Sequence, residues 1–531
     1  MWTTGWRDTI WSQLDKEWDI IVVGGGITGA GILHAASRAG LRTLLVEGHD
    51  FASGTSSRST KMVHGGLRYL KNAQLHVTFE SVSERQRLLR EGRGLIKRMG
   101  FLFASLDGDP MPGWMFGLGL TIYDLMAGQW AHQKYNIEDM CDLCPPLTSR
   151  ALKGGYRYID AQTDDARLTL RVIREAVQDG AVAINYARAI SLLRTQDGHV
   201  RGIVLQDEDP SGNGRTAEVR AHLVISATGA WADVLRSQLG KSRRIRPLRG
   251  SHLIFPTERL NLQRALSWSH PQDGRAIIAM PWEGVILLGT TDIDQGSNLE
   301  INPSISMAEA EYLLQAADYV FPESELSLAD VQATFSGIRP VVDTGKSNPS
   351  KESREYLIWN ENGLITVSGG KLTTFRLMAR DTLAAVRSVL PEHPQFNPNW
   401  TVLKPIPGEM DEMLALNSIK TGQRLRLLGR YGSDAPPLFN RAQKDELTSI
   451  GTSDYLWAEL RWAAHAEGVV HLDDLLLRRA RLGLLLPKGG LNLMDRIRKI
   501  TQPELGWSDE KWVKEEIAYK TLWEERYSIP G

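Results

Sequence analysis

The first part of the chain alternates apolar and small-residue segments in a pattern that is typical of a strand, a turn, a helix and a second strand. Residues 18–23 form an apolar run with the length and the β-branched content of a buried parallel strand. Residues 28–39 have helical spacing with small residues on one side, and residues 41–46 form the next apolar run. The pattern predicts a βαβ start to a parallel sheet.

Three glycines, Gly24, Gly26 and Gly29, occupy the turn between the first strand and the helix. In such a unit the first glycine makes the turn, the second lets the backbone approach a pyrophosphate, and the third lets the helix close on the strand. Glu47 follows the second strand, where a carboxylate accepts hydrogen bonds from a ribose. The spacing predicts a dinucleotide site, but NAD and FAD proteins share it, so the glycines alone do not decide between the two.

The pattern between residues 160 and 230 returns to this first sheet. Residues 168–177 are predicted as an amphipathic helix that Asp164 or Asp165 caps, and residues 181–193 and 200–206 as strands around an Asp-Gly turn. Residues 223–226 form a short buried strand that runs into Ala227-Thr228-Gly229. We expect this strand to rejoin the nucleotide-binding sheet.

From residue 247 onward the pattern changes to short strands separated by polar loops. Residues 247–335 are predicted as an antiparallel sheet, with a helix at 307–319 lying on it. The chain then returns through residues 364–368 to Gly369-Gly370, where a second helix N-terminus can meet a cofactor. Beyond residue 408 apolar residues recur at helical intervals, most clearly in 456–464 and 472–485, so the C-terminal part is predicted to be helical.

Composition adds little to this picture and excludes some classes of function. The chain has 531 residues, which is enough for two or three domains. Its 62 Lys and Arg residues balance 63 Asp and Glu residues, so no overall charge favours nucleic acid as a partner. The two cysteines, Cys141 and Cys144, cannot complete a tetrahedral metal site alone, and we interpret them as structural. No metal site is predicted, and low cysteine usage suits a reducing compartment.

Two segments are candidates for contact with a membrane surface. The N-terminus has charged residues and lacks the apolar core of a secretory signal, and no apolar stretch reaches the length of a bilayer span. Residues 113–127 are nonetheless almost uncharged, and are interpreted as either a core helix or an interfacial segment. The tryptophans at positions 2, 6, 11 and 18 are the second candidate, with packing against the fold as the alternative.

The segment after the second strand is too polar and glycine-rich to continue a plain βαβ pattern. It runs Thr55-Ser56-Ser57-Arg58-Ser59-Thr60-Lys61-Met62-Val63-His64-Gly65-Gly66-Leu67-Arg68-Tyr69-Leu70. This loop resembles the one in FAD-dependent glycerol-3-phosphate dehydrogenases. Further segments agree with that family in order: Asp164-Asp165-Ala166-Arg167-Leu168, Ala227-Thr228-Gly229-Ala230-Trp231, Gly250-Ser251-His252, Gly289-Thr290-Thr291-Asp292, Ser336-Gly337-Ile338-Arg339-Pro340 and Gly369-Gly370-Lys371-Leu372-Thr373-Thr374. The resemblance covers residues 18–390 closely and the C-terminal part more loosely, through Asp473-Asp474-Leu475 and Arg478-Arg479.

The resemblance implies an α/β and α+β fold of three parts. These are a discontinuous FAD-binding Rossmann-like domain of the glutathione-reductase type (18–78, 156–246 and 336–390), an antiparallel-sheet substrate domain (79–155 and 247–335) and a helical C-terminal domain (400–531). It implies non-covalent FAD as the cofactor. The residues expected to contact it are Gly24, Gly26, Ile27, Thr28, Gly29, Glu47, Thr55, Ser56, Ser57, Lys61, His64, Gly65, Gly66, Leu67, Ala227, Thr228, Gly229, Trp231, Gly370, Lys371, Leu372 and Thr373.

The same resemblance implies a phosphate monoester of a secondary alcohol as substrate. Arginine forks bind phosphate bidentately and lysine acts as a point charge, and the matching segments supply such groups. The residues expected to bind substrate are Arg68, Tyr69, Thr290, Arg354 and Lys371. Each arginine taken alone would more often be a surface ion-pair partner, whereas the set together favours an anion pocket.

Oxidation of the alcohol also needs a group that takes the hydroxyl proton. His252 is the first candidate, because the pKa of an unperturbed histidine lies nearest neutrality, and a structural histidine is the alternative. Arg339 is expected to stabilise the alkoxide or the reduced flavin, so the identity of the base stays open. His64 lies in the flavin loop and is expected to contact the ring.

These implications combine into one expected activity with alternatives. The chain is expected to oxidise sn-glycerol 3-phosphate to dihydroxyacetone phosphate by hydride transfer to flavin N5, and to pass the electrons to a membrane quinone. An oxidase that uses oxygen is the nearest alternative, although the short spacing from Met280 to Ser336 lacks the insertion typical of family oxidases. An amine or amino-acid oxidase should lack the cationic set, and a binding or regulatory flavoprotein should lack the proton-transfer residues. We expect a cytoplasmic protein, peripheral on the inner face of the cytoplasmic membrane, with no nucleic-acid partner; a homodimer is left open.

Overall fold

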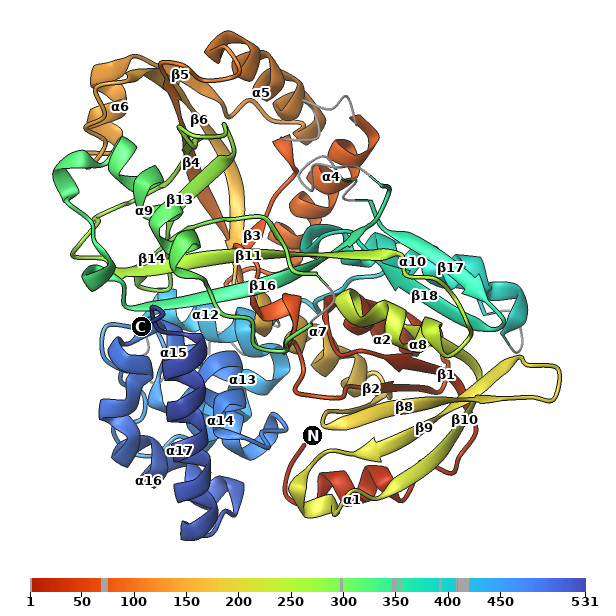
Figure 1. Cartoon of the computed structure of the whole chain (residues 1–531). Helices are drawn as coiled ribbons and strands as arrows, with labels where there is room; N and C mark the ends of the chain where they lie inside the picture. Colours follow the sequence, from red (N-terminus) through yellow and green to blue (C-terminus); the bar gives the residue numbers. More distant parts are fainter. Residues whose placement is uncertain are drawn as a thin grey trace.

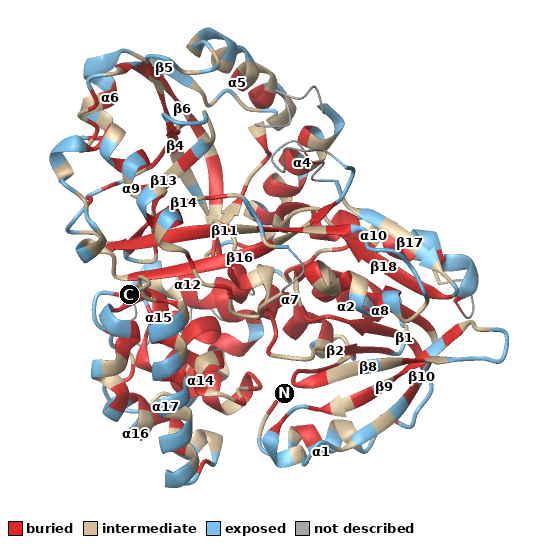
Figure 2. Ribbon diagram, in the orientation of Figure 1, coloured by how far each residue is buried: buried red, intermediate tan, exposed pale blue. Residues whose placement is uncertain are grey.

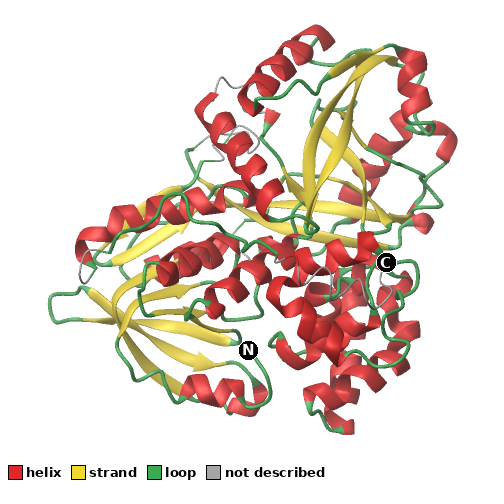
Figure 3. Ribbon diagram, turned by 180° about the vertical axis from the view of Figure 1, so that it is seen from behind, coloured by secondary structure: helices red, strands yellow, loops and turns green. Residues whose placement is uncertain are grey.

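The structure is a computed structural model that describes residues 2–67, 75–296, 299–345, 352, 355–390, 394–406, 408 and 420–531. These residues form two β-sheets and a helical C-terminal part, which Figure 1 shows packed against one another. The three-part architecture expected from the sequence is therefore confirmed. Figure 3, which views the molecule from behind, shows the two sheets as separate layers with the C-terminal helices beside them.

The first sheet is parallel at its centre, as the sequence predicts. Its strands follow the order β17-β18-β10-β1-β2-β7, with β8 and β9 extending from β10 as an antiparallel meander. β1 pairs in parallel with both β2 and β10, so the strand ending at Ser226 does rejoin this sheet. The strands are β1 (Trp18–Val23), β2 (Thr43–Val46), β7 (Val182–Ile184), β8 (Ala187–Arg194), β9 (Val200–Asp207), β10 (Thr216–Ser226), β17 (Leu357–Glu361) and β18 (Leu364–Ser368).

Both faces of β1 are covered, which explains why its sequence is apolar throughout. Ile20 and Val22 pack in the core beneath the helices, whereas Ile21 and Val23 pack against the meander of β8, β9 and β10. On the helix side α2 lies between its neighbours α7 and α10. The helices of this part are α1 (Trp6–Trp11), α2 (Ile27–Arg38), α7 (Asp165–Gln178), α8 (Ala232–Ser237) and α10 (Phe375–Val386), and the side chain of Asp164 caps α7.

The glycines of the first turn are required by close packing. A Cβ on Gly29 would lie 1.9 Å from the carbonyl oxygen of Gly24, so only glycine lets α2 approach β1 at this point. Gly24 itself has a φ of 112° and would place a Cβ 2.6 Å from the oxygen of Ala227. The helix N-terminus is therefore fixed directly beside the ends of β1 and β10.

The second sheet is mostly antiparallel. Its strands follow the order β15-β11-β14-β13-β12-β4-β6-β3, and β16 pairs along almost the whole length of β11. The strands are β3 (Met62–Val63), β4 (Ile96–Leu106), β5 (Gln133–Tyr135), β6 (Leu152–Thr163), β11 (Ile245–Pro256), β12 (Ala265–Ser269), β13 (Ala276–Trp282), β14 (Val285–Gly289), β15 (Ile293–Asp294) and β16 (Ala333–Val342). The helices around it are α4 (Leu75–Glu91), α5 (Gly113–Ala127), α6 (Ile137–Leu143) and α9 (Met307–Val320).

Three segments expected in the nucleotide-binding part lie in the second sheet. They are residues 62–63, 156–163 and 336–342, because β3 pairs with β6, β6 with β4, and β16 with β11. Asp164 directly follows β6 and caps α7, which packs on the first sheet. Arg339 lies within β16, close to the end of that strand. The two sheets are therefore joined directly beside the site.

The C-terminal part is helical, as predicted. Its helices are α12 (Thr421–Tyr431), α13 (Ala435–Arg441), α14 (Trp457–Ala466), α15 (Leu482–Leu485), α16 (Met494–Leu505) and α17 (Asp509–Arg526). The predicted helix over 472–485 is a π-helical turn, Asp474–Arg479, and then α15, separated by Arg481 in the left-handed backbone region. The wide turn places several arginines on the side that faces the first sheet.

The two candidate membrane segments differ in exposure. Trp2 and Trp18 are buried, and the indole of Trp2 donates to the oxygen of Ala183 at 3.0 Å, so the N-terminal tryptophans serve packing. In contrast α5 carries exposed apolar side chains, and it lies at the outer end of the molecule in Figure 2. In the part of the chain described here, no helix combines the length and the apolar character needed to cross a membrane.

Candidate active site

A long cleft opens where the parallel strands of the first sheet end. The segments that follow β1, β2, β10 and β18 all reach it, which is the usual ligand position in an open parallel sheet. Of the residues predicted to bind the cofactor, those lining the cleft are Gly24, Gly26, Ile27, Thr28, Glu47, Thr55, Ser56, Ala227, Thr228, Gly229, Trp231, Gly370, Lys371 and Leu372. The structure thus brings together residues that lie almost 350 positions apart.

Glu47 is held in place by two backbone amides. One carboxylate oxygen accepts from the amide of Gly25 at 2.7 Å and the other from the amide of His49 at 2.8 Å. Burial raises the pKa of Glu47, while these two amides oppose the shift. Each oxygen retains a lone pair, so the carboxylate can still accept hydrogen bonds from ribose hydroxyls in the cleft.

The N-terminus of α2 has the shape that a pyrophosphate requires. The amide of Ile27 donates to Ser56 Oγ at 2.9 Å, which draws the loop of residues 55–57 over the start of the helix. A Cβ on Gly26 would meet only Ser56 Oγ, at 3.0 Å, so the space in front of Gly26 belongs to the cleft. A positive helix end behind a glycine backbone fits the phosphates of a dinucleotide.

Several predicted cofactor residues lie behind the cleft wall and hold its segments. Ser57 and Lys61 are buried, and Lys61 Nζ donates to the oxygen of Ser57 at 2.6 Å and to Asp165 at 2.8 Å. Burial lowers the pKa of Lys61 to about 7, which Asp165 partly offsets. Gly29 contacts Gly24 rather than the cleft. These side chains therefore position the loop instead of facing a ligand.

The glycine pair after His64 is explained by packing against α4 and α5. A Cβ on Gly65 would lie 2.5 Å from both Tyr123 Oη and Val82 Cγ2, and the Gly65 amide donates to Tyr123 Oη at 2.9 Å. Gly66 has a φ of 78°, which favours glycine. Leu67 is half-buried against the core of the second sheet. None of these three residues lines the cleft.

Lys371 lies at the rim of the cleft, near the start of α10. Its ammonium donates to Ser81 Oγ of α4 at 2.9 Å. Burial lowers the pKa of Lys371 to about 7, although Glu80 and Asp160 oppose the shift. A partly buried ammonium beside a cleft is a suitable contact for an anionic group.

His64 lies next to Lys371, and its backbone is held while its imidazole is left accessible. Thr373 brackets its backbone, because Thr373 Oγ1 accepts from the His64 amide at 3.1 Å and donates to its carbonyl at 3.2 Å. The imidazole is half-buried, and no described residue makes a hydrogen bond to it. Burial, Lys371 and Arg85 together lower the pKa of His64 to about 3, so the ring is neutral at physiological pH.

His252 is more enclosed than the sequence suggested. Its side chain is 1% exposed, its ring stacks on Phe335 at a centroid distance of 4.5 Å, and Thr60 Oγ1 lies 3.0 Å from Nε2. Nδ1 is buried and has no hydrogen-bond partner among the residues that the structure describes. Burial, Arg339 and Lys61 hold the pKa of His252 well below its usual range.

Arg339 and Thr290 form a separate contact near His252. Arg339 donates to Thr290 Oγ1 at 2.9 Å, to the oxygen of Thr291 at 3.1 Å and to Asp292 Oδ1 at 3.0 Å. These contacts fix the guanidinium of Arg339. In sequence Arg339 directly precedes Pro340, which lines the cleft. The remaining predicted substrate ligands, Arg68, Tyr69 and Arg354, lie outside the described residues.

The adenine end of the cleft contains residues that sequence reasoning missed. His49 and Arg188 both line it, and Arg188 donates to His49 Nε2 at 3.0 Å and to Glu208 Oε1 at 2.7 Å. Burial and the guanidinium lower the pKa of His49 to about 4. Other lining residues not predicted are Val23, Gly48, Ser53, Gly54, Ser59, Ala189, Val234, Leu235, Ile301, Pro340 and Gly369. Only the position of His49, two residues after Glu47, gave a local signal.

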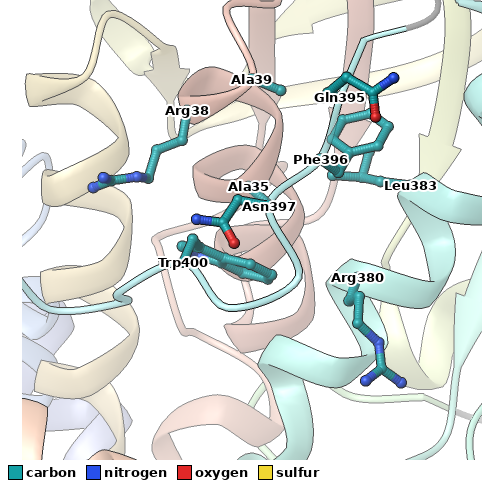
Figure 4. Close-up of a pocket in the computed structure, with 9 residues that line it drawn as sticks. All are labelled: Ala35, Arg38, Ala39, Arg380, Leu383, Gln395, Phe396, Asn397 and Trp400. Atoms are coloured by element: carbon teal, nitrogen blue, oxygen red, sulfur yellow. The ribbon is translucent and has the colours of Figure 1, made fainter.

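A second cavity lies between α2, α10 and residues 395–400, away from the cleft. Figure 4 shows Trp400 between Arg38 and Arg380, whose guanidinium groups lie on different sides and do not point toward each other. Arg38 reaches Asp179 at 3.5 Å and Arg380 reaches Asp381 at 2.6 Å. Because the two guanidiniums do not converge, this cavity is not built for an anion, and the active site is assigned to the cleft.

The two cysteines are free thiols. Burial raises the pKa of Cys144 to about 12, and Cys141 Sγ lies 3.4 Å from the oxygen of Leu147. Neither thiol has the positive surroundings of a reactive cysteine. Among the described residues, no group of three or more His, Cys, Asp or Glu side chains is placed to hold a metal ion.

Comparison with known families agrees with this geometry. Residues 19–379 match the family of FAD-dependent oxidoreductases, and residues 405–512 match the C-terminal domain of alpha-glycerophosphate oxidase. The aerobic glycerol-3-phosphate dehydrogenase of Staphylococcus haemolyticus is 33% identical over 497 residues, covering 89% of this chain and 88% of that protein. That of Staphylococcus aureus (strain bovine RF122 / ET3-1) is 33% identical over 516 residues, covering 93% and 92%.

Solved structures show the same fold. The glycerol-3-phosphate dehydrogenase from Bacillus halodurans, complexed with FAD, is 28% identical, covers 99% of this chain and 98% of its own, and superposes with a TM-score of 0.80. The L-alpha-glycerophosphate oxidase from Mycoplasma pneumoniae, with FAD bound, is 18% identical, covers 74% of this chain and 99% of its own, and has a TM-score of 0.57. The second match shows a shared fold alone.

The assignment of the cleft predicts the effect of a substitution at Gly26. Gly26→Val should weaken FAD binding by roughly 10-fold to 100-fold, because the new side chain would occupy the space for the pyrophosphate. The apoprotein should remain folded, since the only close neighbour of the new Cβ is the hydroxyl of Ser56. Equilibrium titration of the apoprotein with FAD, with Tm of both apoproteins as the control, checks this. A variant with normal FAD affinity would place the pyrophosphate elsewhere.

Proposed function

The chain belongs to the family of FAD-dependent oxidoreductases with the C-terminal domain of alpha-glycerophosphate oxidase, and from this we propose that it is an FAD-dependent sn-glycerol-3-phosphate dehydrogenase. The product is dihydroxyacetone phosphate. The observation that carries the substrate assignment is Lys371, a partly buried cation at the rim of the cofactor cleft beside an unprotonated histidine. An uncharged alcohol would not need a positively charged group at this position.

The residues of the cleft fit FAD as the cofactor. Glu47 is positioned for the adenosine ribose, the start of α2 with Gly26 for the pyrophosphate, and the segment Gly370–Leu372 for the flavin end. When bound, FAD supplies the acceptor for the hydride that leaves the carbinol carbon of the substrate. The protein has two further tasks, which are to hold the phosphate and to take the hydroxyl proton.

Lys371 is proposed to bind the substrate phosphate, together with Arg68, Tyr69 and Arg354. Its pKa of about 7 means that the free enzyme holds this lysine only partly protonated at neutral pH. A bound phosphate dianion favours the protonated form, so binding and protonation reinforce each other. By holding the phosphate at the rim, Lys371 also sets how far the carbinol carbon of the substrate reaches into the cleft.

His64 is proposed as the proton acceptor, in preference to His252. Two observations support this choice: the His64 ring is half-buried and receives no hydrogen bond from the residues that the structure describes, and it lies within the electrostatic reach of Lys371. His252 is enclosed by Phe335 and Thr60. We propose that Thr290 positions Arg339, whose charge lowers the proton affinity of the substrate hydroxyl.

A quinone in the membrane is proposed as the electron acceptor, and α5 as the surface that contacts the bilayer. Trp114 and Trp130 are 67% and 70% exposed, and Met115, Leu118 and Leu125 are also exposed on or beside this helix. The one charged side chain of α5, Asp124, is buried and contacts His132 at 2.8 Å. An exposed helix without exposed charge, flanked by tryptophans, suits a lipid interface.

The inner face of α5 connects this surface with the flavin loop. Tyr123 Oη donates to Asp160 at 2.8 Å and accepts from the Gly65 amide at 2.9 Å, next to His64. Contact of α5 with a membrane would therefore bring the lipid surface close to the open end of the active site. This supports a lipid-dissolved acceptor over oxygen and, with it, a peripheral position on the inner face of the cytoplasmic membrane.

The first prediction concerns the phosphate handle. Lys371→Ala should raise KM for glycerol 3-phosphate by roughly 30-fold to 150-fold, which is about 2 to 3 kcal/mol for a lost charge-assisted contact. From pH 7 to 9 the wild-type kcat/KM should fall as Lys371 loses its proton, whereas Lys371→Arg should stay flat. Steady-state turnover with a dye acceptor or with oxygen, and with unphosphorylated glycerol as the control substrate, measures this. Equal kcat/KM for glycerol and its phosphate would overturn the substrate assignment.

The second prediction separates the two histidines. His64→Asn should lower kcat by roughly 100-fold to 10,000-fold, because the proton acceptor is lost, while FAD content stays normal. His252→Asn should mainly lower Tm, through loss of its stacking on Phe335. Because the pKa of His64 in the free enzyme is about 3, kcat/KM should show no acidic limb from this residue between pH 5 and 9. A large loss of kcat in His252→Asn and a small one in His64→Asn would show that His252 is the proton acceptor.

The third prediction concerns the exposed face of α5. Leu118→Glu combined with Leu125→Glu should reduce binding to phosphatidylcholine vesicles by at least about tenfold, because two apolar side chains leave the lipid interface. Ile517→Glu on α17 is a matched control, since Ile517 is equally exposed but lies among charged residues. Co-sedimentation at low and high salt checks both variants. Unchanged binding of the double variant would exclude α5 as the contact.

A further inference from the structure

Two motifs that take no part in the proposed chemistry meet in the structure. Residues 164–167, at the start of α7, and residues 473–481, around the π-helical turn, are about 300 positions apart in sequence. The arginines of the second motif, Arg478, Arg479 and Arg481, are buried and point out of the C-terminal part. We refer to these three residues as the arginine cluster.

The first target of the arginine cluster is Asp50, in the loop between Glu47 and Thr55. Arg479 donates to both oxygens of Asp50, at 2.6 and 2.7 Å, and Arg478 Nε donates to Oδ2 at 2.5 Å. Asn185 Nδ2 completes the set at 2.9 Å. Although burial by itself would raise it, Arg479 and Arg478 hold the pKa of Asp50 at about 2, so the carboxylate stays charged.

The second target is the backbone of the loop that covers the start of α2. Arg481 Nη2 donates to the oxygen of Ser57 at 2.8 Å, where Lys61 Nζ also donates. Ser57 follows Ser56, whose hydroxyl accepts from the amide of Ile27 at the helix N-terminus. One side of this loop thus faces the cofactor cleft and the other faces the arginine cluster.

The cluster is itself fixed by α7. Arg167 forms a bidentate pair with Glu467, at 2.5 and 2.9 Å, and donates to the carbonyl oxygen of Arg479 at 2.9 Å. Arg430 and Tyr455 both donate to Asp164 at 2.9 Å. These contacts cross from the nucleotide-binding part to the C-terminal part and are buried on both sides. The position of the arginines is therefore set by the docking of the C-terminal part.

The buried charge of Asp50 makes the loop of residues 50–57 depend on the docking of the C-terminal part. A carboxylate buried like Asp50 is stable only beside a positive charge, and the cluster supplies that charge. Without it, Asp50 would have to turn toward water, and residues 52–57 would move with it. Phe51 is buried in the core and fixes the start of the loop, but residues 52–57 carry only small side chains.

We propose that Arg479 and Arg481 are positioning residues for FAD: from the C-terminal part they hold residues 50–57 in the shape that binds the cofactor pyrophosphate. The inference rests on the proposed function for the identity of the cofactor. It gives the helical C-terminal part a role in cofactor retention, although none of the residues described in that part lines the cleft.

The rate of FAD release from the holoenzyme tests the proposal. Arg481→Met should release FAD at least about tenfold faster than the wild type, because a charge-assisted contact to the loop is lost. Added FAD should restore turnover. Arg461→Met is the matched control: Arg461 is also buried and pairs with Glu446 and Glu504 within the C-terminal part, and none of its described hydrogen bonds or ion pairs reaches the loop. It should lower Tm but leave FAD release unchanged.

Either of two outcomes would overturn the proposal. One is Arg481→Met with a wild-type rate of FAD release; the other is equal acceleration by Arg461→Met, which would show an effect of stability alone. A wild-type protein that takes up no FAD would instead contradict the proposed function.

Hydrogen exchange on the wild type provides a measurement that does not depend on a variant folding. FAD added to the apoprotein should slow amide exchange in residues 474–485 more than in α16, which lies in the same part of the chain but does not contact the loop. Equal protection of both segments would again contradict the proposal.

Discussion

A carboxylate that is buried away from water needs a positive charge beside it, and this requirement ties the parts of the chain together. Asp50 is paired with Arg478 and Arg479, Asp165 with Lys61, and Asp160 with Arg85 at 2.7 Å. Each of these carboxylates lies behind a segment that forms or adjoins the active site. The segments have few large side chains facing the ligand, so their conformation is set from behind by buried ion pairs.

This division explains the choice of residues on the two sides of each loop. On the ligand side, glycine and serine let a backbone amide or a hydroxyl come close, as at Gly26 and Ser56. On the inner side, long cationic side chains reach across the boundary between the sheets and the C-terminal helices. Lys61 acts in the same way without crossing that boundary, since its sequence position suggests a cofactor contact while its ammonium is used for Asp165 of α7. A motif that is specific for a family is thus partly a motif of packing.

The sequence was sufficient for features that depend on neighbouring residues. The buried strand at 18–23, the glycine turn, the capped helix after Asp164 and Glu47 were predicted because apolar spacing and cap residues are local signals. Long-range pairing carries no such signal, and this is why residues 156–163 were placed in the wrong sheet and why Arg188 was missed. Of the two histidines, sequence alone gave no reason to expect that Phe335, 83 positions away, would enclose His252.

The neighbourhood of His64 shows how phosphate recognition and proton transfer can depend on one another. Burial, together with the charges of Lys371 and Arg85, keeps the imidazole unprotonated, which a base requires, but the same surroundings also make it a weak base, with a pKa of about 3. A phosphate dianion bound at Lys371 would offset this positive field, and an offset field raises the proton affinity of the ring. The anion that positions the substrate would therefore also strengthen the base that acts on its hydroxyl group. On this view a substrate without the phosphate loses more than a binding contact, because it leaves His64 beside uncompensated cations.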